Sequence, residues 1–301
     1  MVNTKQATIG FIGTGVMGEQ MAQNLLSAAY NVHIFTRTKE KAQALLKNGA
    51  IWENSVADLT RASNIIITMV GYPDDVEQVY FGREGIIENA HKGTYLIDMT
   101  TSKPSLAQTI FTKAKTKNLY ALDAPVSGGD VGAKHGTLAI MVGGEEDVFK
   151  DMMPIFNILG ENIVWHGQAG AGQHAKLANQ ITIASNMIGV CEAIIYAKKA
   201  SLDPSRLLDS ITTGAAGSWS LSNLAPRMIN SDFSPGFFVK HFIKDMTIAL
   251  EAAKDMGLET PGLKLSLSLY EELASMGECD SGTQALIKYF EQKAMKHTLK
   301  T

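Results

Sequence analysis

The chain has 301 residues, of which 45% are hydrophobic and 19% charged, and its formal net charge is −3. This composition is that of an ordinary globular protein with room for two domains, and it gives no reason to expect a nucleic acid or a membrane as a partner. Cys191 and Cys279 lie far apart without the spacing of a disulfide framework or a zinc site, and the first ten residues contain no apolar signal core, so we expect a cytoplasmic protein.

The first expected strand, residues 8–12, leads into a glycine-rich turn and then into an amphipathic helix. The turn has the pattern G-x-G-x-x-G and comprises Gly13, Thr14, Gly15, Val16, Met17 and Gly18. Gly13 permits a tight turn, Gly15 lets a pyrophosphate approach the backbone, and Gly18 lets the helix pack close to the strand. The free N–H groups at the start of the helix then attract phosphate. A ligand-free turn is the alternative, but the flanking strand and helix favour a dinucleotide site.

Beyond this helix, strand-like and helix-like segments alternate up to about residue 165. Short apolar runs predict strands at residues 32–35, 64–69, 94–98, 119–122, 138–142 and 162–165. Helices are expected at residues 38–48, at residues 73–80 and after Pro104. The alternation is typical of a Rossmann domain, an α/β fold with a doubly wound, mostly parallel sheet that binds its ligand at the carboxyl ends of the strands.

The end of the second strand indicates which dinucleotide is bound. An NAD site usually has Asp or Glu here, whereas an Arg accommodates the 2′-phosphate of NADP. The sequence reads Thr36-Arg37-Thr38, with no carboxylate before Glu40. Arg37 suits a phosphate because its guanidinium can bind two oxygens at once. A solvated loop arginine is the alternative, but we expect NADP in preference to NAD.

The second half of the chain is expected to be all-helical. Residues 168–200 form one long segment with few charges, and helical periodicity recurs at residues 204–212, 237–256, 261–275 and 281–296. Polar residues within the long segment make a membrane span a poor explanation. We therefore predict an NADP-binding Rossmann domain over residues 1–166 and an all-α substrate and oligomerisation domain over residues 167–301, joined by the long helix.

Two stretches have the composition of reactive sites. Residues 123–129, Asp-Ala-Pro-Val-Ser-Gly-Gly, follow a strand and offer the Ser127 hydroxyl and the bare amides of Gly128 and Gly129 to a carboxylate, although a plain Pro/Gly turn fits equally well. Lys176 lies near the start of the long helix, beside few other charges. A lysine removed from water has a lowered pKa and can act as a general acid or base, unless its side chain extends to solvent.

Together these motifs resemble the β-hydroxyacid dehydrogenase family, which includes 3-hydroxyisobutyrate dehydrogenase, tartronate semialdehyde reductase and glyoxylate/succinic semialdehyde reductases. The resemblance covers nearly the whole chain through GFIGTGVMGEQMAQNL, DAPVSGG, GAGQHAKLANQ and the Phe237-x6-Lys244-Asp245 segment. It implies a Rossmann domain followed by a helical domain, usually in a homodimer or homotetramer. It also implies a small substrate that carries a carboxylate.

By resemblance, Lys176 is the catalytic acid/base, and Ser127, Gly128 and Gly129 hold the substrate carboxylate. The family's substrate-binding Asn corresponds to Gln180, with Asn179 just before it, so either amide is a candidate. Further substrate contacts are expected from Trp219 and Phe237, although Trp219 fits a core or interface aromatic equally well. Further cofactor contacts are expected from Met69, Val70, Thr101, Lys244 and Asp245. The loop that begins with Met69 and Val70 is longer than in many members.

The combined interpretation is an NADP(H)-dependent oxidoreductase that interconverts a short β-hydroxy acid and its semialdehyde or oxo acid. No histidine–carboxylate cluster has metal-ligand spacing, so we expect no metal. An imine reductase of the same fold is one alternative, but those relatives generally replace the lysine. A non-catalytic NADPH-binding protein is another, and an intact Lys176 counts against both.

Overall fold

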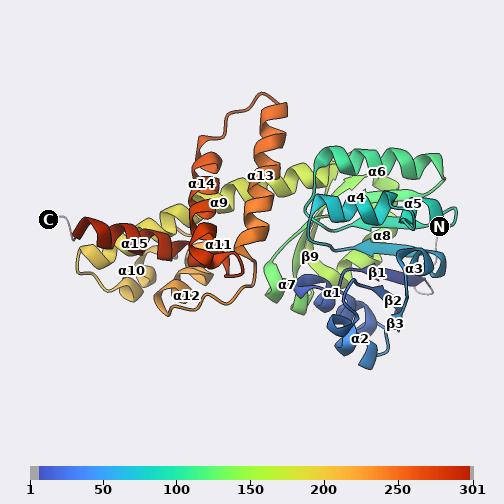
Figure 1. Cartoon of the computed structure of the whole chain (residues 1–301), viewed down its shortest axis with the longest axis horizontal. Coiled ribbons are helices and arrows are strands. Elements are labelled where there is room, and N and C mark those ends of the chain that lie inside the picture. Colours follow the sequence, from blue (N-terminus) through green and yellow to red (C-terminus); the bar gives the residue numbers. More distant parts are fainter. Residues whose placement is uncertain (1–6, 299–301) are drawn as a thin grey trace. The chain divides into compact units, whose positions relative to one another are not determined.

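The computed structural model describes residues 7–298, with side chains described up to residue 295. The chain divides into two compact units, one ending at Lys176 and the other beginning at Leu177. The first unit contains the sheet and the helices that cover it, and the second unit is helical, as the sequence predicts (Figure 1).

The first unit is built on a nine-stranded sheet in which the first six strands along the chain run parallel. Their order across the sheet is β3-β2-β1-β4-β5-β6, with bounds β1 (Thr8–Ile12), β2 (Asn31–Phe35), β3 (Ile51–Trp52), β4 (Ile65–Thr68), β5 (Tyr95–Asp98) and β6 (Tyr120–Asp123). The chain leaves β1 towards β2 on one side and later returns to β4 on the other. This reversal opens a crevice for ligand at the carboxyl ends of β1 and β4.

Three further strands extend the sheet beyond β6. β8 (Leu138–Gly144) runs antiparallel to β6 and to the short β7 (Val126–Ser127), and β9 (Gly160–Gly167) runs parallel to β8. β3 and β7 have two residues each, and neither is among the predicted strands. Segments this short show no alternation of apolar and polar residues, which is the signal on which strand prediction depends.

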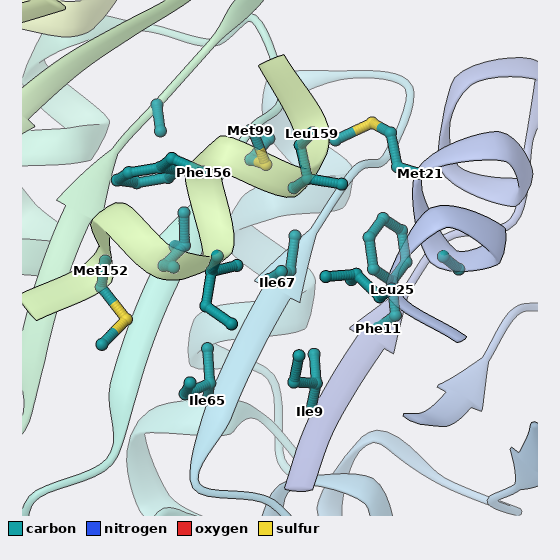
Figure 2. Packing of buried hydrophobic residues seen from close by; sticks show 14 of the residues in the cluster. Ile9, Phe11, Met21, Leu25, Ile65, Ile67, Met99, Met152, Phe156 and Leu159 are labelled. Carbon is teal, nitrogen blue, oxygen red and sulfur yellow. The ribbon is translucent and has the colours of Figure 1, made fainter. Parts of the chain in front are cut away.

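Helices cover both faces of this sheet because successive strand residues point to opposite sides. On one face, α1 (Val16–Ser27) and α8 (Glu146–Leu159) pack over Ile9, Phe11, Ile65 and Ile67, as Figure 2 shows. Ile66 points to the other face. There it packs with side chains from α3 (Val56–Ala62), α4 (Pro73–Phe81), α5 (Ile86–Asn89) and α6 (Pro104–Thr116). The predicted doubly wound sheet is confirmed.

Several helices of the first unit differ from expectation: α3, α5 and α8 are not among the predicted helices, and residues 38–48 and 129–135 differ as well. The segment expected as one helix over residues 38–48 is a 3₁₀ turn, η2 (Lys39–Ala42), followed by the short α2 (Gln43–Lys47). Turns of this kind are frequent at helix starts, and the hydrophobic pattern does not distinguish them from α-helix. A second helix, α7 (Gly129–His135), begins inside the predicted Gly-Gly turn.

The long helix α9 (Ala171–Lys199) begins in the first unit and continues into the second. By length and composition alone it could cross a membrane, since its most apolar window has a mean hydropathy of 1.3. Its buried side chains, among them Leu177, Met187 and Ile194, belong to the hydrophobic core of the second unit, as those of a core helix do.

The remaining helices of the second unit pack around that core. They are α10 (Pro204–Ile211), α11 (Trp219–Asn223), α12 (Ala225–Ile229), α13 (Val239–Asp255), α14 (Pro261–Leu273) and α15 (Leu286–Thr298), with the short turns η3 (Ala274–Glu278) and η4 (Thr283–Ala285). α13 and α14 lie side by side, and the Phe242 ring meets the Tyr270 ring edge-on at 5.0 Å (Figure 1). Within the described part of this unit, β pairing is limited to one bridge between Phe238 and Gly282.

Candidate functional site

The glycine turn after β1 lies against the loops that follow β2 and β4. The Gly13 N–H donates to the Phe35 carbonyl oxygen over 2.9 Å, and the φ of Gly13 is +97°. A Cβ on Gly13 would lie 2.2 Å from the Met69 carbonyl oxygen and 3.3 Å from Val70 Cγ1, so another residue would not fit. At Gly15, the N-cap of α1, no described atom lies within 4 Å of an added Cβ. The turn is therefore packed on one side and open to a ligand at Gly15.

The side chain of Thr14 also indicates that this turn binds a ligand. Thr14 is almost fully buried, yet its hydroxyl oxygen has no hydrogen-bond partner among residues 7–295. A buried hydroxyl without a partner costs about 1–3 kcal/mol, and a phosphate oxygen at the start of α1 would supply one. The orphaned hydroxyl and the open Gly15 backbone fit the diphosphate of a dinucleotide.

Arg37, the residue expected at the 2′-phosphate, contacts a carboxylate from another loop. Its Nη1 lies 2.9 Å from Asp75 Oδ1, in the first turn of α4, and the Arg37 side chain is 81% exposed. The other Asp75 oxygen accepts the Tyr72 N–H at 3.1 Å and caps α4. The local sequence has no carboxylate after Arg37 before Glu40, but the fold supplies one because β2 and β4 both flank β1. Asp75 is a functional candidate that local sequence reasoning missed.

The predicted carboxylate-binding residues lie where β7 turns into α7. Ser127 is half-buried and pairs with Ala139 of β8, so the backbone on its strand side is held by the sheet. Gly128 is the N-cap of α7 and Gly129 its first residue. The first N–H groups of a helix have no partner within the helix, so these amides are available to an anion.

Lys176 follows a helix start that is fastened to the end of β6. Asp123, the last residue of β6, accepts the Gly170 N–H at 2.7 Å and the Gln173 N–H at 2.8 Å. Burial raises the pKa of the Asp123 carboxyl, and these N–H donors oppose the rise. Lys176 lies one turn further along α9 and is only 6% exposed. The anchor holds Lys176 at a defined place, and the snorkelling alternative does not apply to so buried a side chain.

A second anchor joins the same turn of α9 to the loop between β5 and α6. Gln173 Oε1 accepts the Ser102 N–H at 2.9 Å, and Gln173 Nε2 donates to the Thr100 carbonyl oxygen at 2.8 Å. Thr101, the residue expected near the nicotinamide, lies between these two contacts. The Thr100 hydroxyl oxygen in turn accepts the Val70 N–H at 3.0 Å, which ties in the loop after β4. Gln173 was inside a recognised motif but had no assigned role.

Asp98 lies beside Asp123 at the end of the neighbouring strand. Its Oδ1 accepts the Thr68 hydroxyl at 2.8 Å and the Thr100 N–H at 3.1 Å. Burial raises the pKa of Asp98 to about 6, against the opposing effect of these hydrogen bonds. The folded chain therefore binds a proton here at a pH where the unfolded chain has lost it.

This proton linkage predicts how stability depends on pH. Because the folded pKa of Asp98 exceeds the unfolded value of 3.8, its contribution to the free energy of unfolding is complete below about pH 4 and is lost as the pH rises through 6. The loss is roughly 2–3 kcal/mol. The Asp98→Asn side chain keeps an acceptor for the Thr68 hydroxyl and cannot ionise. As the pH rises from 4.5 to 7.5, the melting temperature of this variant should therefore fall less than that of the wild type. Parallel pH dependences of the two proteins would contradict the assignment.

In the second unit, the predicted polar residues of α9 and α13 form a connected cluster. Gln180 Nε2 donates to Asp245 Oδ2 at 2.6 Å, and Gln180 Oε1 accepts from Asn179 Nδ2 at 2.8 Å. Lys244 Nζ lies 3.0 Å from the other Asp245 oxygen. Both ends of the Gln180 amide thus have partners in this cluster, whereas Asn179 is only half-buried. Of the two amides, Asn179 is the less buried.

The two predicted aromatic residues of the second unit have different environments. Phe237 is partly buried against the core, with its ring 5.7 Å from that of Phe242. Trp219 is the first residue of α11 and is 62% exposed, which excludes the core alternative for it.

Known proteins resemble the chain over both of its halves. A family model described as the NAD binding domain of 6-phosphogluconate dehydrogenase matches residues 8–167, and one described as "NAD-binding of NADP-dependent 3-hydroxyisobutyrate dehydrogenase" matches residues 170–290. A probable 3-hydroxyisobutyrate dehydrogenase-like protein of Arabidopsis thaliana is 48% identical, over 96% of this chain and 86% of its own. The chain belongs to the β-hydroxyacid dehydrogenase family.

Other known proteins match over nearly their whole length. An uncharacterized oxidoreductase of Bacillus subtilis is 64% identical over 93% of this chain and 98% of its own. The 2-hydroxy-3-oxopropionate reductase of Escherichia coli is 38% identical over 95% and 98%. A 3-hydroxyisobutyrate dehydrogenase of Mycobacterium tuberculosis, solved with L-serine, has a TM-score of 0.86 at 30% identity, over 95% of this chain and 99% of its own. As a member of this family, the chain is an NAD(P)-dependent oxidoreductase that acts on CH–OH groups.

Proposed function

We propose that this enzyme interconverts a short β-hydroxy acid and its semialdehyde or oxo acid, with NADP preferred over NAD and with Lys176 as the general acid/base. The observation that carries the proposal is the placement of Lys176. It is a buried amine on a helix whose first turn is fastened to the end of β6 and to both residues that flank Thr101. A proton donor needs this fixed position to meet a reacting atom within hydrogen-bond distance.

In the proposed reaction, each side chain has a separate task. Ser127 and the Gly128 and Gly129 amides hold the substrate carboxylate and so orient its carbonyl carbon. Lys176 Nζ donates a proton to the carbonyl oxygen as that oxygen gains negative charge, and in the oxidative direction the neutral amine removes the hydroxyl proton. The nicotinamide, when bound, supplies or accepts the hydride. Its diphosphate would be held at Gly13, Thr14 and Gly15.

The remaining assignments in the second unit are proposed on the family resemblance. Asn179 is our choice for the substrate amide, because Gln180 has partners at both ends. Lys244 is assigned to the cofactor, with Asp245 as the carboxylate that holds it at 3.0 Å. Phe237 and Trp219 are assigned to the substrate. A cytoplasmic location and a homodimer or homotetramer complete the proposal.

The proposed NADP preference predicts opposite effects for the two members of the Arg37–Asp75 pair. Arg37→Ala should weaken NADPH binding by roughly 10–100-fold and leave NADH binding within about threefold, because it removes charge-assisted hydrogen bonds to the 2′-phosphate. Asp75→Asn should strengthen NADPH binding by up to about fivefold, since an exposed ion pair is weak and the amide oxygen can still cap Tyr72 N–H. Titration of cofactor fluorescence measures both. Equal effects of Arg37→Ala on the two cofactors would contradict the assignment.

The experiment that tests the proposed function is a substrate panel. The purified enzyme is mixed with NADPH and with short semialdehydes, 2-oxo acids, 3-oxo acids and cyclic imines, and the loss of NADPH absorbance is followed. We expect turnover with at least one carboxylate-bearing aldehyde or ketone and none with the same compound as its methyl ester. Turnover of imines alone would replace the proposal by an imine reductase, and tight NADPH binding without turnover would indicate a binding protein.

A further inference from the structure

Gln173 is a fully buried polar side chain whose hydrogen bonds lie on both sides of one residue. Its Nε2 donates to the Thr100 carbonyl oxygen at 2.8 Å, and its Oε1 accepts the Ser102 N–H at 2.9 Å. The residue between them is Thr101. The Gln173 backbone N–H donates to Asp123 Oδ2 at 2.8 Å, so side chain and main chain are both engaged. One residue therefore joins the first turn of α9 to the end of β6 and to the β5–α6 loop.

Few side chains could replace that of Gln173 at this position. The Thr100 carbonyl needs a donor and the Ser102 N–H needs an acceptor, and Gln173 is buried with 0% exposure, so water does not readily replace either. A primary amide supplies one donor and one acceptor side by side. A carboxylate supplies acceptors only and would face the Thr100 carbonyl oxygen unfavourably.

Lys176 follows Gln173 by three positions and therefore lies on the same side of the helix, about one turn along. A shift of the first turn of α9 relative to the β5–α6 loop must move Lys176 relative to Thr101 by a similar amount. Misplacement of a reacting group by about 1 Å can cost 10²-fold in rate.

We propose that Gln173 is a positioning residue that sets Lys176 in register with the Thr101 segment of the cofactor site. The inference rests on the proposed role of Lys176 as the acid/base. Gln173 touches neither substrate nor cofactor in this scheme and acts through the helix turn and the loop that it joins.

The test uses two substitutions in the full-length enzyme. Gln173→Met keeps the length of the side chain and removes both hydrogen bonds, so kcat should fall roughly 10–100-fold at every pH while the Kd for NADPH stays within about threefold. Gln173→Glu should show a similar loss at pH 8. When the introduced carboxyl gains a proton, it becomes both a donor and an acceptor, like the amide. The kcat of Gln173→Glu relative to wild type should therefore rise at least about tenfold between pH 8 and pH 5.5.

The titratable groups around this position allow the carboxyl of Gln173→Glu to gain a proton within the pH range of the test. Asp123 contacts the Gln173 N–H, Asp98 accepts the Thr100 N–H, and Lys176 lies on the next turn. Burial and the two carboxyls raise the pKa of an introduced carboxyl above the ordinary value of about 4.3, and the lysine opposes them. Both variants are compared with wild type at each pH, and Gln173→Met, which introduces no titratable group, shows how the shared groups alone change the ratio.

His174→Glu is the matched control. It places the same carboxyl one residue further along the same turn, at an exposed position, and should leave kcat within about twofold at all pH values. A normal kcat for Gln173→Met, or a Gln173→Glu activity without acid rescue, would overturn the positioning role. If these outcomes appear while Lys176→Met is inactive, the proposed function stands and this inference alone fails. An active Lys176→Met would remove the basis of both.

Discussion

Lys176→Met is expected to lower kcat by roughly 10²–10⁴-fold, which is the usual contribution of a general acid or base. Methionine retains an unbranched apolar chain, so the buried site of Lys176 stays filled and the change removes mainly the amine. The proposed phosphate-binding residues, Gly13, Thr14 and Gly15, lie on a different element, so the Kd for NADPH should change little. Single-turnover loss of NADPH absorbance measures the chemical step directly.

Two controls make this result specific to the amine. Lys198→Met removes an exposed lysine near the other end of the same helix, one that pairs with Glu291 at 2.7 Å, and should leave kcat within about twofold. In Lys176→Ala, a small primary amine added to the solution should restore part of the activity, because it can occupy the space left by the side chain. Near-normal turnover by both Lys176 variants would end the acid/base assignment.

The sequence was sufficient for those parts of the fold that repeat a local pattern. β4 (Ile65–Thr68) is a continuous apolar run, and the glycine fingerprint follows another such run and opens an amphipathic helix. β7 and α7 were missed because two residues of strand and seven of helix around Gly128 and Gly129 carry no such pattern. The antiparallel pairing of β8 was also out of reach, since hydrophobicity alone does not give the direction of a strand.

In the candidate site too, residues within a local motif could be predicted, whereas contacts between distant segments could not. Lys176 and Gly13 could be chosen because their neighbours in sequence explain them. Asp75 could not be placed beside Arg37, from which it is 38 residues away, nor Gln173 beside Ser102, at a separation of 71. Such contacts depend on which strands are neighbours in the sheet, and a single sequence does not record that order.

Asp98 and Asp123, at the ends of neighbouring strands, have different hydrogen-bond partners. They are register partners on β5 and β6, and burial raises the pKa of both. Asp123 meets the N–H groups at the start of α9, a setting that stabilises negative charge. Asp98 meets a hydroxyl and one N–H, and the nearby charge of Asp123 raises its pKa further. Asp123 thus fastens the helix that carries Lys176, whereas Asp98 holds the loop that follows β5.

Gly172→Ala should show the largest effect of any single methyl group added to α9. A Cβ on Gly172 would lie 2.3 Å from the Met141 carbonyl oxygen and 2.7 Å from that of Asp123, and backbone atoms of a central sheet cannot move aside. The start of α9 must therefore shift away from β6 and β8, which weakens the hydrogen bonds to Asp123. We expect the free energy of unfolding to fall by about 1–3 kcal/mol and kcat to fall at least about tenfold.

Gly189→Ala provides the matched control on the same helix. Gly189 is exposed, and no described atom lies within 4 Å of its added Cβ. Alanine is the better helix former, so this variant should be more stable by up to about 1 kcal/mol and retain its activity. Thermal unfolding and steady-state kinetics of the two variants test the argument together. The contrary outcome is a Gly172→Ala variant as stable and as active as Gly189→Ala. The methyl group would then be tolerated at a position where the backbone leaves it no room. Close contact of α9 with the strand ends could therefore not be what places Lys176.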